Sequence, residues 1–146
     1  MFTKTNLGNG WFKLSEQSAA LAAGGTTSVT SSAITGDMIN DLAKAGSYML
    51  QVTIGAGTIV ADTHVHGVQD DSTTYQVISS DIIVDQAAGT KLVKVDSGVA
   101  SPGLKFVTEK DSGGSTAKVT WTVMYWDGGP AMSDMTISGS VGKDPS

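Results

Sequence analysis

Hydrophobic and polar residues alternate along three long stretches of the chain. The stretches are Tyr48 to Ile54, Thr58 to His66 and Thr116 to Trp126, and apolar residues occupy nearly every second position in each. A period of two predicts a β-strand with one face buried. Shorter segments rich in Val, Ile and Thr, at 26–34, 73–85, 91–96 and 104–109, predict further strands between Gly-, Asp- and Ser-containing turns.

Two segments show a helical pattern instead. Thr35 is placed as the N-cap of a helix that continues to Ala45, with Asp37 in its first turn, Lys44 in its last turn and Gly46 as a stop. A weaker pattern, residues 15–23 (SEQSAALAA), predicts a short helix followed by two glycines.

The two ends of the chain lack the core pattern. We expect residues 1–10, which finish in a Gly-Asn-Gly sequence, to form an N-terminal arm that either is solvated or lies on another subunit. Residues 11–127 form the predicted β core domain, and residues 128–146 a C-terminal tail. The predicted fold is mainly β: an antiparallel barrel or jelly-roll-like sandwich of about eight strands with one or two short helices and extended terminal arms.

Composition narrows the function classes. The chain of 146 residues has no Cys, which excludes disulfide scaffolds, thiol nucleophiles and Cys-ligated metals. All its cations are Lys and its net charge is −5, so a nucleic-acid partner is not expected. It shows neither a secretory signal nor a membrane span, which predicts synthesis in the host cytoplasm and no membrane partner. With so few catalytic residue types, we predict that it is not an enzyme.

The sharpest chemical motif is His64-Val65-His66, which contains both histidines of the chain. Residues i and i+2 of a strand share a face, so the imidazoles could bind one transition metal, with Asp62 as a third ligand. The motif resembles the first motif of cupins, with Gly57 and Asp70 near the expected places, but the later cupin histidine is missing. It also resembles pairs in trimeric phage spike proteins, in which three chains would supply six nitrogens. The alternative is a polar strand face with no metal or other cofactor.

A second motif is Asp111-Ser112-Gly113-Gly114, which resembles the nucleophile loop of chymotrypsin-like serine proteases. It departs from the family at Lys110, where the family has Gly, and the chain is too short for the two barrels of such enzymes. A hairpin loop in which glycines supply positive φ explains the residues fully.

Four aromatic residues near the ends of the predicted core are candidate interface anchors. They are Phe2, Trp11, Phe12 and Trp126. Exposed aromatics of this kind are typical of protein–protein contacts. The alternative is that they close the open ends of the barrel.

In overall style the chain resembles the virion structural proteins of tailed bacteriophages, particularly capsid decoration or cement proteins. The resemblance is carried by MFTKTNLGNGW, WTVMYWDGG and the polar tail. It implies a homotrimer on the outer capsid surface of the virion that bridges subunits of the major capsid protein. The alternatives are a tail, spike or baseplate module with a trimeric metal site, or a small cupin-like metal-binding or carbohydrate-binding β protein.

Overall fold

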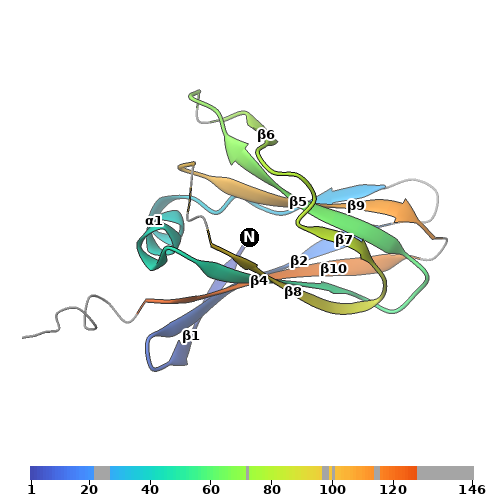
Figure 1. Cartoon of the computed structure of the whole chain (residues 1–146), viewed down its shortest axis with the longest axis horizontal. Coiled ribbons are helices and arrows are strands. Elements are labelled where there is room, and N and C mark those ends of the chain that lie inside the picture. Colours follow the sequence, from blue (N-terminus) through green and yellow to red (C-terminus); the bar gives the residue numbers. More distant parts are fainter. Residues whose placement is uncertain (22–26, 72, 97–98, 100, 114–115, 128–146) are drawn as a thin grey trace, which may run out of the picture.

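In a computed structural model, the chain forms two antiparallel β-sheets packed face to face (Figure 1). The structure describes residues 1–21, 27–71, 73–96, 99, 101–113 and 116–127. The first sheet has the order β1-β2-β10-β4-β8, and the second has the order β3-β9-β5-β6, with β7 also paired to β5. The elements are β1 (Thr3–Gly8), β2 (Trp11–Leu21), β3 (Ser28–Thr30), α1 (Gly36–Ala45), β4 (Tyr48–Ile54), β5 (Val60–Val68), β6 (Tyr75–Val77), β7 (Ile83–Gln86), β8 (Gly89–Val95), β9 (Leu104–Ser112) and β10 (Ala117–Trp126).

The predicted alternation builds the core between the sheets. Strands β4 and β5 alternate strictly between buried and half-exposed positions, and β10 directs Val119, Trp121, Val123 and Tyr125 inward. The fold class is therefore confirmed as a jelly-roll-like β-sandwich. Its described part has ten strands rather than eight, because the regions around β1 and 73–86 contribute additional short strands.

The predicted helix after Thr35 is confirmed as α1, which covers one end of the sandwich (Figure 1). Ile39 and Leu42 are buried there, and Gly46 has φ 81° and donates its N–H to the carbonyl of Leu42 at 3.1 Å. Thr35 has the extended backbone of an N-cap, although its side chain makes no capping hydrogen bond. At ten residues, α1 is far too short to cross a membrane, and the described residues contain no other α-helix.

The helix predicted for residues 15–23 is wrong over the residues that the structure describes. Residues 15–21 belong to β2, which pairs with β10 from Trp11 to Leu21. Leu14 and Leu21 are fully buried in this strand. Burial beside β10 outweighs the helix propensity of the local Ser, Gln and Ala residues. Residues 22 and 23 lie outside the described part.

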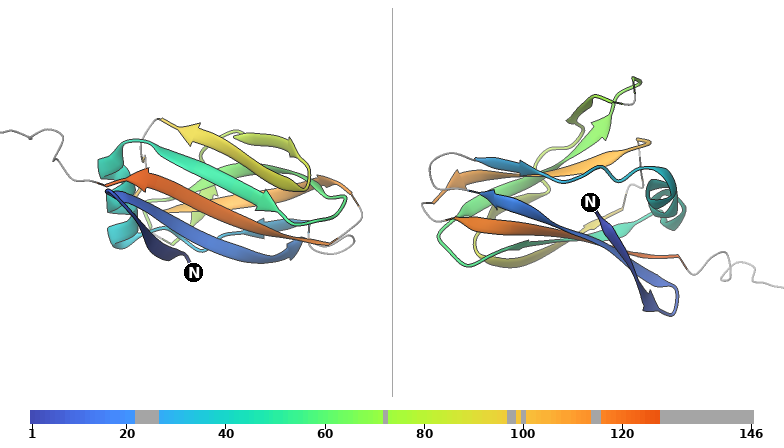
Figure 2. Two further views of the ribbon diagram at one scale, coloured as in Figure 1. Left: turned by 90° about the horizontal axis from the view of Figure 1, so that it is seen from below. Right: turned by 180° about the vertical axis from the view of Figure 1, so that it is seen from behind.

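The predicted N-terminal arm is also wrong as a description of residues 1–10. Residues 3–8 form β1, which pairs with β2 through a turn whose Gly8, Asn9 and Gly10 have φ of 89°, 56° and 87°. Phe2 is only 4% exposed and packs edge-on against Phe106, with ring centroids 6.3 Å apart. The turn end of this hairpin projects beyond the sandwich (Figure 2). The predicted tail, 128–146, lies outside the described residues.

Two polar contacts connect the sheets. The Trp121 indole N–H on β10 donates to Thr108 Oγ1 on β9 at 2.9 Å, and that hydroxyl lies 2.8 Å from Thr63 Oγ1 on β5. The buried Gln86 side chain of β7 donates to the carbonyl of Val52 on β4 at 2.7 Å. Buried donors such as these are stable when they are paired in this way. The inward face of β5 is thus fixed, and its outward face carries the histidines.

Candidate functional site

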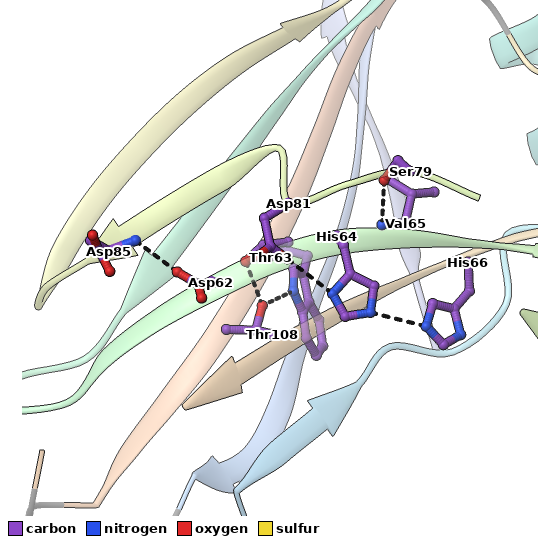
Figure 3. Close-up of polar contacts among 10 residues, drawn as sticks. Asp62, Thr63, His64, Val65, His66, Ser79, Asp81, Asp85 and Thr108 are labelled. Atoms are coloured by element: carbon purple, nitrogen blue, oxygen red, sulfur yellow. Dashed lines mark hydrogen bonds and ion pairs between the residues drawn. The ribbon is translucent and has the colours of Figure 1, made fainter. Parts of the chain in front are cut away.

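The two histidines lie side by side on the outward face of β5 (Figure 3). Their Nε2 atoms are 3.0 Å apart, and their rings are stacked with centroids 5.0 Å apart and planes inclined by 29°. Nδ1 of His64 lies 3.4 Å from Oδ1 of Asp81. The two imidazoles therefore share one face of β5, as the period of two predicts. The structure adds Asp81, which lies 15 residues beyond His66 and which no local pattern indicates.

Asp81 is held beside His64 by the segment between β6 and β7. Backbone hydrogen bonds join Ile78 N–H to the carbonyl of Val65 at 3.0 Å and Ile82 N–H to the carbonyl of Thr63 at 2.8 Å. Ser79 Oγ accepts a third hydrogen bond, from the N–H of Val65, at 3.1 Å (Figure 3). The segment therefore follows β5 closely on both sides of Asp81.

The electrostatic surroundings favour the neutral form of His66. Burial, the neighbouring imidazole of His64 and the ammonium of Lys105 together hold the pKa of His66 below its usual value. Lys105 is the register partner of His66 on β9, and its Nζ lies 4.3 Å from the centre of the Tyr75 ring. An unprotonated His66 has a nitrogen lone pair available for hydrogen bonding or metal binding.

Asp62, predicted as a third ligand, belongs to a different group of side chains. Its Oδ1 accepts a hydrogen bond from the backbone N–H of Asp85 at 2.8 Å. Carboxylate oxygens of Asp62, Asp85 and Asp111 lie within 4.8 Å of one another. A hydrogen bond with Asp85 and the charge of Asp62 raise the pKa of Asp111. Among the described residues, neither histidine joins a group of three or more such potential ligands.

The protease-like motif does not assemble a catalytic site in the described residues. Ser112 pairs with Val60 at one end of β5, whereas His64 pairs with Val107 further along the same strand. Four residues of strand correspond to about 13 Å. Gly113 has φ 108°, as the hairpin interpretation predicts, while the predicted loop is shortened because β9 continues to Ser112.

The four candidate interface aromatics divide into two pairs. Phe2 is buried, and Phe12 stacks on Tyr125 with centroids 5.9 Å apart. Trp11 is 48% exposed and pairs in register with Trp126, whose indole N–H donates to the carbonyl of Asn9 at 3.2 Å. Phe12 thus packs partly against the core, and the exposed Trp11 and half-buried Trp126 remain candidate interface anchors.

Trp11 and Trp126 border a groove of about 200 Å³ at the hairpin end of the first sheet. Met49 and Met124, which are register partners on β4 and β10, also line it. We call these four residues the apolar corner. The remaining lining residues are Ala45, Ser47, Tyr48, Lys94 and Tyr125. Sequence reasoning missed the methionines, although both stand at positions of the alternating pattern that otherwise carry polar residues.

Neither a protein-family model nor a curated protein matches the chain. Solved structures with a similar arrangement include a carbohydrate-binding module of type CBM28 specific for non-crystalline cellulose (8% identity, 88% of this chain and 82% of that chain covered, TM-score 0.42). Another is the Tobacco streak virus coat protein (12% identity, 84% of this chain and 89% of that chain covered, TM-score 0.36). A third is a pilus protein of Bacillus endospore appendages (12% identity, 86% of this chain and 90% of that chain covered, TM-score 0.41). Structural and binding β-sandwiches both occur among them. At these TM-scores the likeness assigns no function.

Proposed function

We propose that this protein is a virion structural protein that decorates a phage capsid and bridges subunits of the major capsid protein. The observation that carries the proposal is the apolar corner. Aromatic and Met side chains are enriched in the centres of protein–protein interfaces, whereas isolated exposed apolar residues need no explanation. Here two Trp and two Met residues line one groove.

The rest of the outward face of the first sheet is more polar than the apolar corner. Register pairing places Lys13, Met124, Met49 and Lys94 in one row across the sheet, and Ser15, Thr122, Gln51 and Leu92 in the next. The following row contains Thr120, Thr53 and Thr90. Apart from Leu92 on the edge strand β8, the apolar side chains of these rows lie at the end near the hairpin, as in an interface with an apolar centre and a polar rim.

The β1–β2 hairpin supplies the projecting element that the N-terminal arm was expected to supply. Leu7 is exposed in β1, and Trp11 begins β2 directly after the turn. We propose that the tip of this hairpin and the apolar corner bind the capsid surface together, with the protein assembled as a homotrimer. A deletion of residues 1–10 cannot test this idea cleanly, because it also removes the buried Phe2 from the core.

Point variants provide the sharper experiment. Purified protein should co-sediment with heads of the parent phage that lack it, and Trp11→Ala should weaken this binding at least tenfold, as expected for an interface hot spot. Leu92→Ala is the matched control, since Leu92 is 57% exposed on the same sheet but lies at its β8 edge. Equal loss of binding in both variants, or no binding of the wild type, contradicts the proposal. Light scattering tests the homotrimer, for which three chains of 14.9 kDa give about 45 kDa.

One observation favours a second candidate, a carbohydrate-binding module. Two Trp residues, Trp11 and Trp126, border the corner groove. Indole rings provide large apolar contact areas, and the N–H groups at their edges can hydrogen-bond. Native gels containing soluble hydroxyethyl cellulose test this candidate. Retarded migration that Trp126→Ala abolishes supports it, whereas unchanged migration of the wild type in the presence of the polymer contradicts it for this polysaccharide.

A further inference from the structure

We infer that His64 and His66 form a chelating site for one divalent transition-metal ion of the Ni²⁺ or Cu²⁺ type, bound through both Nε2 atoms. This inference does not depend on the proposed function. It rests on the separation of the two nitrogens and on the carboxylate behind His64.

The separation of the nitrogens matches a particular coordination angle. Imidazole nitrogens lie about 2.1 Å from a bound transition metal. Two such bonds at a right angle place the nitrogens about 3.0 Å apart, whereas a tetrahedral angle places them about 3.4 Å apart. The observed Nε2–Nε2 distance is 3.0 Å. The separation is therefore the one that two neighbouring positions of an octahedral or square-planar ion require, and the stacked rings must turn so that both lone pairs meet at the ion. N and O ligands provide such coordination for Ni²⁺ and Cu²⁺.

In the protein without metal, the same Nε2–Nε2 distance is that of a hydrogen bond between the two rings. The carboxylate of Asp81, 3.4 Å from Nδ1 of His64, favours the tautomer with the proton on Nδ1. His64 Nε2 is then an acceptor, and the Nε2–H of His66 donates to it. When a metal binds, His66 must carry its proton on Nδ1 instead, so both rings stay neutral and no proton is released. The hydrogen bond holds the two nitrogens at the chelating distance beforehand.

Asp81 occupies the position of a supporting residue rather than a ligand. Metal-bound histidines commonly donate their second N–H to a carboxylate, which fixes the ring and increases its basicity. The three hydrogen bonds of the 78–82 segment to β5 keep Asp81 in place. Because Asp81 contacts Nδ1, the Nε2 atom of His64 is left for the metal.

One cation, Lys105, acts on His66 and opposes a bound cation. Lys105 pairs with His66 in register, but its ammonium lies over the Tyr75 ring, 4.3 Å from the ring centre. The carboxylate of Asp81 partly offsets its charge. With two protein nitrogens per ion, water completes the coordination.

Calorimetric titration of the full-length protein with NiCl₂ tests the inference. We expect one ion per chain, and a loss of affinity of at least tenfold in His64→Asn and in His66→Asn. Asp81→Asn should weaken binding about tenfold, the lower end of the range for supporting carboxylates. Asp62→Asn is the matched control and should bind as the wild type does, because Asp62 faces Asp85.

A second measurement excludes effects of misfolding. In NMR spectra of the wild type, paramagnetic Ni²⁺ should broaden backbone signals around residues 63–67 first, while urea midpoints confirm that each variant is folded. Binding that is unchanged in both histidine variants, or broadening centred on Asp62, Asp85 and Asp111, would overturn the inference. A wild type that takes up no Ni²⁺ at millimolar concentration would overturn it as well.

Discussion

Replacing Thr108 by Val should destabilise the sandwich more than its small change in shape suggests. Val has nearly the same volume as Thr but cannot accept the hydrogen bond from the Trp121 indole, which is fully buried. A buried donor left without a partner costs about 1–3 kcal/mol. Thr63, also buried, loses its hydroxyl partner at the same time. We therefore expect Thr108→Val to reduce the free energy of unfolding by about 2–3 kcal/mol.

Thr63→Val provides the comparison. Trp121 keeps its acceptor in this variant, so the loss should be about 1 kcal/mol, the usual net contribution of one hydrogen bond. The double variant should be no less stable than Thr108→Val alone, because removing both hydroxyls leaves only the indole unpaired. Urea unfolding monitored by tryptophan fluorescence and circular dichroism measures all three. A Thr108→Val variant no less stable than Thr63→Val would refute the idea that Thr108 connects the two sheets.

Three further predictions concern stability. Phe2→Ala should reduce the free energy of unfolding, measured in urea, by about 3 kcal/mol, because the buried Phe2 packs against Phe106. Near-wild-type stability would instead indicate that residues 1–10 form a free arm. Gly113→Ala should be clearly less stable than Gly8→Ala. Both glycines have positive φ, but a Cβ at 113 would meet the backbone of Thr58, whereas a Cβ at 8 would meet open space. Equal thermal midpoints of the two variants would contradict this. Burial raises the pKa of Tyr48 to about 12, so the folded state holds a proton that the unfolded state releases above about pH 10. Stability should therefore fall by about 2 kcal/mol between pH 10 and 12, and Tyr48→Phe should remove this part of the decline.

The elements predicted correctly are those in which the local pattern and the tertiary packing agree. In β10, every second residue is apolar and buried, and α1 has its dipole-compatible charges and a Gly stop. Segment 15–21 was mispredicted because it pairs with the distant strand β10, and segment 3–8 because a strand without buried residues shows no apolar alternation. The residues of β1 are all exposed, so its sequence resembles coil. Its start is anchored by the buried Phe2 and by two ion pairs, of the N-terminus with Glu16 at 3.1 Å and of Lys4 with Asp41 at 2.9 Å.

The candidate site was predictable only in part, for a similar reason. The period of two places His64 and His66 on one face, and the structure confirms it. The same rule placed Asp62 beside them. Alternation along one strand cannot show that the carboxylate of Asp62 accepts a hydrogen bond from the backbone N–H of Asp85 instead. Asp81 belongs to the separate segment 78–82, and its position beside His64 depends on the hydrogen bonds of that segment to β5. Met49 and Met124 were visible in the sequence as apolar residues at outward positions, and their juxtaposition required the pairing of β4 with β10.

The pairing of β2 with β10 has a consequence for biosynthesis. Ser15 and Thr122 face each other across this ladder although 107 residues separate them. The ribosome adds about 5–20 residues per second, so a newly made β2 waits several seconds for its partner. During that interval an edge that later lies inside the sheet is unprotected, and contacts of such long range also form slowly. The first sheet can therefore form completely only after β10 has been synthesised.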